Sequence, residues 1–107
     1  MARLHQDIHR ELGILQLELQ NLGIWSDLAP SEEALLSTEP FCCDLMSFAE
    51  WLQWILIPRL SYLAETGADL PQKSGILPMA EKAFNDLEDA VRGLLGSIKR
   101  IDALLTA

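Results

Sequence analysis

The chain has 107 residues, half of them apolar, and sixteen acidic against eight basic residues give a formal net charge of −8. This length fits one domain, residues 1–107, with enough apolar side chains to bury a core. The carboxylate excess argues against direct nucleic-acid binding and against anionic membranes, because both depend on Lys and Arg. No apolar run approaches the ~20 residues of a membrane span and the N-terminus lacks a secretory signal, so we expect a cytoplasmic protein.

An amphipathic helix is predicted over residues 2–22, followed by a stop at Gly23. Spacings of three and four place one set of apolar side chains on a single face: Leu4, Ile8, Leu12, Leu15, Leu19 and Leu22. Gly13 lies inside this helix at a cost that packing offsets. His5 and His9 stand four residues apart, a spacing that can chelate a metal. Because no further ligand pattern accompanies them, we expect solvated histidines, no metal site and no cofactor.

A second long helix is predicted over residues 48–65, after a polar connection in which Ser31 begins a short helical turn. Ser47 and Glu50 have the spacing of a capping box at its start, and Gly67 supplies its end. Residues 68–75 then form a loop.

The remainder of the chain, residues 79–105, reads as helix, with Pro78 in the first turn and a cap at Asn85 and Asp86 that splits the stretch in two. The pattern predicts an all-α fold, an up-and-down bundle of three to four helices. Its second long helix is tryptophan-rich and kinked by a proline.

The second long helix contains residues that break its amphipathic pattern. Pro58 interrupts an apolar run, Trp54 and Ile57 fall in the polar arc, and Arg59 falls in the apolar arc. One interpretation is structural: a kink re-phases the helix, and the stem of Arg59 packs while its head reaches Asp44, Glu50 or solvent. On that interpretation Arg59→Ala costs more stability than an exposed substitution.

The other interpretation is an exposed contact surface, because Trp and Arg are enriched at binding hot spots. The candidate partner-binding residues are Phe41, Asp44, Trp51, Gln53, Trp54, Ile57 and Arg59. Adjacent Cys42 and Cys43 are expected to be reduced thiols, since neighbouring cysteines form only a strained disulfide. No catalytic or phosphate-binding motif is found, so no catalytic residue is assigned and a non-enzyme is predicted.

The central block resembles the YqcC-like family of small bacterial proteins, formerly a domain of unknown function. The matching residues are Ser37-Thr38-Glu39-Pro40-Phe41, Asp44, Met46, Glu50-Trp51-Leu52-Gln53-Trp54, Ile57-Pro58-Arg59, Leu70-Pro71 and the ILPMAE segment at 76–81. The resemblance implies a compact helical bundle. It also implies an association with a tRNA pseudouridine synthase, because family members are commonly encoded beside such an enzyme and some carry its name.

This chain does not resemble the synthase itself, which is a much larger α/β protein with a catalytic Asp in an Arg-Leu-Asp context. The tripeptide Arg100-Ile101-Asp102 is read as a coincidence in a helix.

Three functions therefore stay open. The favoured one is a non-catalytic interaction or accessory domain whose protein partner is a tRNA pseudouridine synthase, with charge complementarity between the acidic chain and a basic enzyme. The second is a small-molecule-binding or catalytic domain with its site near Asp44, Trp51 and Arg59. The third is a structural homodimer that buries Trp54 and Ile57 across a two-fold axis.

Overall fold

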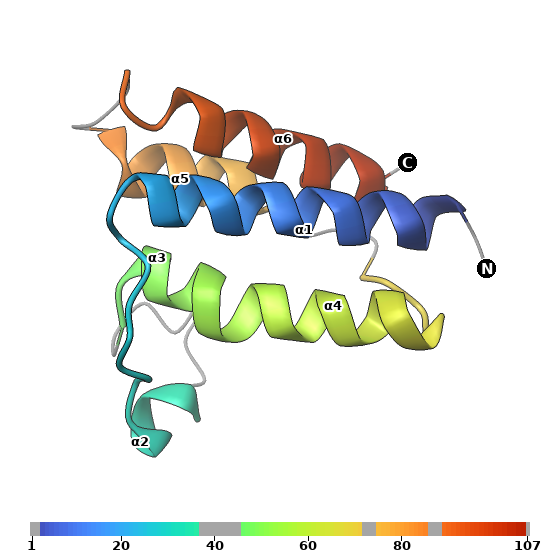
Figure 1. Ribbon diagram of the computed structural model, residues 1–107, viewed down its shortest axis with the longest axis horizontal. Coiled ribbons are helices and arrows are strands. Elements are labelled where there is room, and N and C mark those ends of the chain that lie inside the picture. Colours follow the sequence, from blue (N-terminus) through green and yellow to red (C-terminus); the bar gives the residue numbers. More distant parts are fainter. Residues whose placement is uncertain (1–2, 37–45, 72–74, 86–88, 107) are drawn as a thin grey trace.

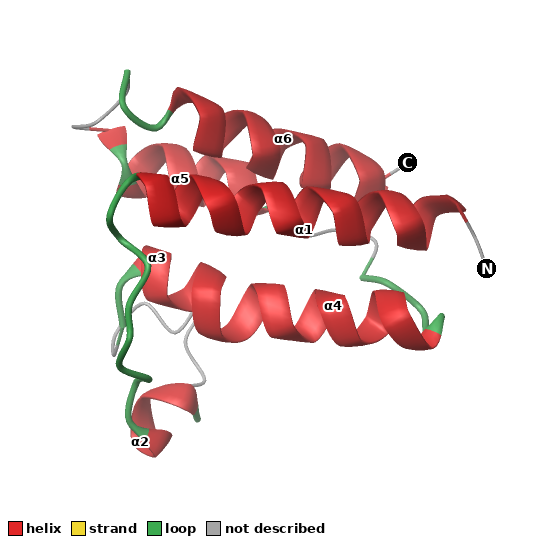
Figure 2. Cartoon of the chain, viewed as in Figure 1, coloured by secondary structure: helices red, strands yellow, loops and turns green. Residues whose placement is uncertain are grey.

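A computed structural model describes residues 3–36, 46–71, 75–85 and 89–106, and within these ranges every regular element is helical (Figure 2). The expectations for Phe41, Asp44 and the two cysteines lie outside the described residues. No described helix combines the length and the apolar character that a membrane crossing requires.

Helix α1 (Arg3–Asn21) confirms the predicted first helix to within one residue at each end. Its stripe of side chains spaced by three and four residues is buried: Ile8, Leu12, Leu15 and Leu19. Gly23 adopts φ 73°, and the Ile24 N–H reaches back 3.2 Å to the Leu19 carbonyl. This left-handed turn closes the helix, as expected for a C-terminal glycine.

The second long helix is continuous from α3 (Phe48–Trp51) through a π-helical turn η2 (Leu52–Leu56) into α4 (Ile57–Thr66). Its start confirms the predicted capping box: the Ser47 N–H donates to Glu50 Oε1 at 3.0 Å and the Glu50 N–H to Ser47 Oγ at 3.1 Å. At its end Gly67 is left-handed, with φ 70°, and the Ala68 N–H donates to the Leu63 carbonyl at 3.0 Å. The short turn predicted at Ser31 is also present as α2 (Glu32–Leu35), capped by the Ser31 hydroxyl.

The π turn accounts for the misfit of Pro58. Proline has no N–H for the carbonyl four residues back, and its ring crowds that carbonyl in a regular α-helix. Here the Ile57 N–H donates to the Leu52 carbonyl, five residues back, and the wider turn carries the chain into α4 with Pro58 at its start. Residues five apart then share a face, so Leu52 and Ile57 are both buried.

The C-terminal region consists of two helices, α5 (Ile76–Ala83) and α6 (Arg92–Thr106). The stretch is divided into two helices as predicted, but α5 begins before Pro78 and ends at Ala83, and α6 begins only at Arg92, not at the predicted cap. Of that cap, Asp86 lies outside the described residues. Phe84 follows as a buried residue. The N-terminus of α5 is capped from α6, because the Ile76 and Leu77 N–H groups donate to the two oxygens of Asp102 at 3.2 and 2.7 Å.

The helices form the predicted up-and-down bundle (Figure 1). Helix α1 lies between α4 and α6 and runs antiparallel to both, while α5 packs beside α6. The main core gathers buried apolar residues from all four of these helices and from η2: Ile8, Leu12, Leu15, Leu19, Leu52, Leu56, Ile57, Leu60, Ala64, Ile76, Ala80, Phe84, Val91, Leu94, Ile98, Ile101 and Leu105. At one end of the bundle, α2 projects below the layer of α4.

Two glycines give opposite predictions for stability. Gly13 is exposed inside α1 with nothing near an added Cβ, so Gly13→Ala should raise the free energy of unfolding by about 0.5–1 kcal/mol. Gly67 also has open space around it, but its φ of 70° is unfavourable for alanine, so Gly67→Ala should lower that free energy by about 1–2 kcal/mol. Urea denaturation measures the free energy of unfolding of both variants. A change of the same sign and size in the two would contradict this account of the two glycines.

Candidate interaction surface

The segment after α1, residues 24–36, is called the arm. It crosses one end of the bundle, and α2 forms its tip (Figure 1). Its first residues, Ile24 and Trp25, pack against the main core. Near its other end, Ala34 forms a second buried cluster with Met46, which lies just before α3. Trp51 and Ile55 of the second long helix pack on this cluster. The arm is therefore tied to the bundle at both of its ends.

Gln53 holds the arm in place and does not offer a surface for a partner. Its side chain is only 5% exposed. Its Oε1 accepts from the Ser26 N–H at 2.7 Å, and its Nε2 donates to the Ser26 carbonyl at 2.6 Å. These two bonds satisfy both the N–H and the carbonyl of Ser26. They replace the hydrogen bonds to water that these backbone groups lose where the arm packs on the bundle.

Trp51 also serves the attachment of the arm. It is half-buried, lies against both the main core and the second cluster, and stacks on Phe48 with ring centroids 5.6 Å apart. Phe48 in turn meets Phe84 edge-on at 5.9 Å. The tryptophan thus joins the arm, the second long helix and the residue after α5 into one packed unit.

The remaining candidate contacts divide between core and surface. Ile57 is 8% exposed and belongs to the main core, so it is not available for a partner or for the proposed two-fold interface. Trp54 is half-buried and its indole N–H is enclosed without a partner in the described structure. Arg59 is exposed and forms no ion pair with any described residue, so Arg59→Ala is expected to behave as a surface substitution.

Among the described residues, three of the five exposed large apolar side chains lie on the arm, and the other two are Leu17 on α1 and Tyr62 on α4. Leu28 is 80% exposed and Leu36 79%, and Leu35 on α2 is 39% exposed. Asp27, Glu32 and Glu33 stand among these leucines and are also exposed. None of the three carboxylates forms an ion pair within the described part of the chain. Apolar residues clustered with charged ones at a protruding end are typical of a contact surface.

The charge of the chain is divided in the same way. Residues 11–58 contain eight carboxylates and no Lys or Arg, and the rest of the chain contains eight of each sign. The eight carboxylates are Glu11, Glu18, Asp27, Glu32, Glu33, Glu39, Asp44 and Glu50. The whole net charge of −8 therefore belongs to the half of the sequence that includes the arm. This uneven distribution of charge, together with the leucines of an otherwise polar connection, is the feature of the sequence that could have identified the arm as a candidate surface.

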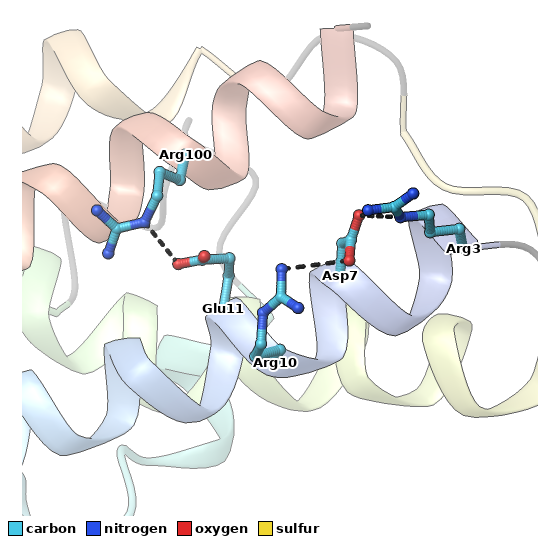
Figure 3. A network of polar contacts seen from close by, with 5 residues as sticks. All are labelled: Arg3, Asp7, Arg10, Glu11 and Arg100. Carbon is cyan, nitrogen blue, oxygen red and sulfur yellow. Dashed lines mark hydrogen bonds and ion pairs between the residues drawn. The ribbon is translucent and has the colours of Figure 1, made fainter.

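Arg3 and Arg10 of α1 and Arg100 of α6 form an ion-pair network on the opposite part of α1 (Figure 3). Arg10 lies 3.2 Å from Asp7, and the Arg100 Nε donates to the buried Glu11 carboxylate at 2.9 Å. Arg3 approaches Asp7 at 4.0 Å. Among the described members of the acidic stretch, Glu11 is the one that forms an ion pair within the fold.

Two cavities lined by described residues open beside α1, and Trp51 and Arg59 line neither of them. One, of about 360 Å³, lies against α4 and is lined by His5, Gln6, His9, Ala64 and Glu65. The other, of about 320 Å³, is lined by Arg10, Glu11, Arg100, Ala103 and Leu104. No group of three His, Cys, Asp or Glu residues suited to a metal occurs among the described residues.

The expectation that both histidines are solvated is wrong for His5. Its Nε2 lies 2.8 Å from the Ala68 carbonyl, which can only accept, so this nitrogen carries the proton. The bond ties the start of α1 to the loop after α4. His9 is exposed and lies 3.7 Å from Glu65.

The tripeptide at the end of the chain has a structural role that its sequence did not reveal. Asp102 caps α5 through both carboxylate oxygens, and Arg100 pairs with Glu11, 89 residues away. Both side chains are therefore occupied by contacts between helices.

The comparisons with known proteins give one consistent family. The family described as "tRNA pseudouridine synthase C" matches residues 7–104. The chain belongs to this family, the YqcC-like proteins. An uncharacterised protein of Haemophilus influenzae is 45% identical over 84 residues, which are 76% of this chain and 79% of that one. The uncharacterised protein YqcC of Escherichia coli is 31% identical over 100 residues, or 94% and 92% of the two chains.

Two further matches concern the fold and the family name. The solution NMR structure of Escherichia coli YqcC has a TM-score of 0.86 at 30% identity, covering 98% of this chain and 90% of that one. A protein of Pectobacterium carotovorum named tRNA pseudouridine synthase C is 38% identical over 72 residues. Those residues are 67% of this chain but only 19% of the Pectobacterium protein, so the YqcC-like segment is a small part of a much longer chain.

Gln53→Ala should release the arm. The substitution removes both bonds to the Ser26 backbone and leaves buried polar groups unsatisfied, so the free energy of unfolding should fall by about 1–3 kcal/mol. Limited proteolysis should also cut within residues 24–36 sooner than in the wild type. Gln20→Ala, at an exposed position of α1, is the matched control and should change stability by less than about 0.5 kcal/mol. An unchanged rate of cleavage in Gln53→Ala would mean that the clamp does not hold the arm.

Asp102→Asn tests whether the tripeptide is structural. One of the two α5 N–H groups loses its charged acceptor at a helix N-terminus, and the free energy of unfolding should fall by about 1–2 kcal/mol. Asp69→Asn, in the exposed loop before α5, changes the charge equally and should be neutral. If thermal unfolding did not separate the two variants, the cap would contribute nothing.

Proposed function

We propose that this chain is a non-catalytic interaction domain that acts as an accessory of a tRNA pseudouridine synthase, and that it contacts the enzyme through the arm. The observation that carries the proposal is the coincidence of two features in residues 24–36. The two most exposed leucines of the described residues, Leu28 and Leu36, lie there, and so do carboxylates that no described cation balances.

The family supports the identity of the partner. A protein named tRNA pseudouridine synthase C contains a YqcC-like segment that takes up 19% of its length, and the family bears the same description. A segment joined to an enzyme in one bacterium is a reasonable candidate for a separate partner of that enzyme in another. Linking the two raises their effective concentration without any new contact, so a contact useful in the longer protein can also form between separate chains.

Charge supports the same partner. An enzyme that binds tRNA neutralises phosphates with Lys and Arg and therefore has a basic surface. Residues 11–58, with eight carboxylates and no Lys or Arg, complement such a surface and would speed the encounter at low salt. Leu28, Leu35 and Leu36 would supply apolar area to bury once the two surfaces meet.

The motif residues take an indirect part in this proposal. Gln53 and Trp51 fix the arm against the second long helix, so its leucines are held in one arrangement before the partner binds. Such preorganisation reduces the ordering cost of association. On this proposal, the motif at residues 50–59 is typical of YqcC-like proteins because it positions the arm, and not because its own side chains contact the partner.

The test is a titration of the purified chain with the tRNA pseudouridine synthase from the same bacterium, followed by isothermal calorimetry. We expect a complex with Kd in the micromolar range or tighter. The double variant L28S/L36S should weaken it at least tenfold, about 1.4 kcal/mol. The control L17S/Y62S removes two exposed apolar side chains from α1 and α4 and should leave Kd within twofold. Absence of a complex at tens of micromolar, with both proteins folded by circular dichroism, would refute the accessory role.

A further inference from the structure

We propose that the arm docks on the surface with which the synthase binds RNA phosphates, so that this chain and tRNA compete for the enzyme. The inference rests on the proposed function and adds to it the place of contact and its regulatory consequence. Its basis is the set of arm carboxylates that form no ion pair or side-chain hydrogen bond in the described structure.

Half of the carboxylates among the described residues form an ion pair or a capping hydrogen bond within the fold. Asp7, Glu11, Glu65 and Asp89 form ion pairs. Two more sit at helix starts, Glu50 in the capping box of α3 and Asp102 on the cap of α5. Glu18 lies over Gly93 in the first turn of α6, 2.7 Å from the position that a Cβ would take there. Such positions near helix N-termini favour a negative charge.

The carboxylates of the arm form fewer contacts within the isolated chain. Asp27, Glu32 and Glu33 are exposed, and no ion pair or side-chain hydrogen bond in the described structure engages them. Glu32 and Glu33 start a helix of only four residues, which gains little from them. Like charges gathered at one end repel each other and tend to destabilise a compact fold. A partner that supplies cations removes this repulsion.

The chemistry of the partner indicates where those cations lie. In an enzyme that binds tRNA, the strongest positive potential is found where Lys and Arg contact phosphates. A surface of exposed carboxylates is steered to that potential before any other part of the enzyme, because long-range attraction acts first in an encounter. Leu28 and Leu36, about four-fifths exposed, then distinguish the arm from RNA, since they bury apolar area that a phosphate backbone lacks.

Competition follows if the two ligands share one set of cations. The chain would be displaced by tRNA and would displace it in turn, with a reciprocal effect on the two affinities. Such an accessory would limit the fraction of synthase that binds tRNA when substrate is scarce, and would leave the enzyme as tRNA accumulates.

The experiment measures fluorescence anisotropy of a labelled, unmodified tRNA transcript bound to the full-length synthase while the chain is added. We expect displacement, with half-maximal effect near the Kd that calorimetry gives for the protein complex. E32Q/E33Q should raise that concentration at least fivefold. D69N/E81Q removes two exposed carboxylates outside residues 11–58 and should leave it within twofold. The chain alone should not bind the transcript.

The possible outcomes distinguish a failure of the competition with tRNA from a failure of the accessory role. If calorimetry detects a complex whose formation leaves tRNA affinity unchanged, or if the three components form a ternary complex, competition is refuted and the accessory role survives. If no protein complex forms, both proposals fail. If E32Q/E33Q and D69N/E81Q displace tRNA equally well, overall charge and not the arm is responsible, and the docking site is wrong.

Discussion

The buried stripe of α1 is the constraint on which the rest of the fold depends. Ile8, Leu12, Leu15 and Leu19 lie almost wholly out of water, and α1 lies between α4 and α6. Fully burying one such side chain contributes about 1.5–3 kcal/mol, so one helix supplies a large share of the apolar stabilisation for two interfaces. The ion pair of Glu11 with Arg100 and the Ser97 hydroxyl on the Glu11 carbonyl then set the register of α6 along α1.

Local chemistry was readable from the sequence because its causes are local. The capping box at Ser47, the stop at Gly67 and the placement of Pro78 each depend on neighbours within a few residues, and all three were predicted. The π turn was not predicted, and it moved Ile57 from the polar arc into the core. A regular helical wheel assumes 3.6 residues per turn, so it cannot represent one wider turn.

Contacts between residues far apart in the chain could not be predicted from the sequence, for a different reason. Gln53 with Ser26, Asp102 with the start of α5 and Arg100 with Glu11 join residues 25 to 89 positions apart. Only the assembled bundle brings them together. The motif at residues 50–59 breaks the amphipathic pattern of its helix, and the sequence left both a structural and a partner-contact interpretation of its side chains open. In the structure Trp51 and Gln53 hold the arm, which carries the exposed leucines and the unbalanced charge.

The position of α6 has a consequence for how the protein is made. During synthesis the facing residues of α1 and α4 are available first, and they can pack once the chain as far as Thr66 has left the ribosome. The other side of α1 packs against Arg92–Thr106, which is translated after α4. Until then Glu11 has no Arg100 to pair with, and the apolar stripe remains partly open to water. The nascent chain is therefore expected to be most vulnerable to aggregation and to chaperone capture in the interval between these two events.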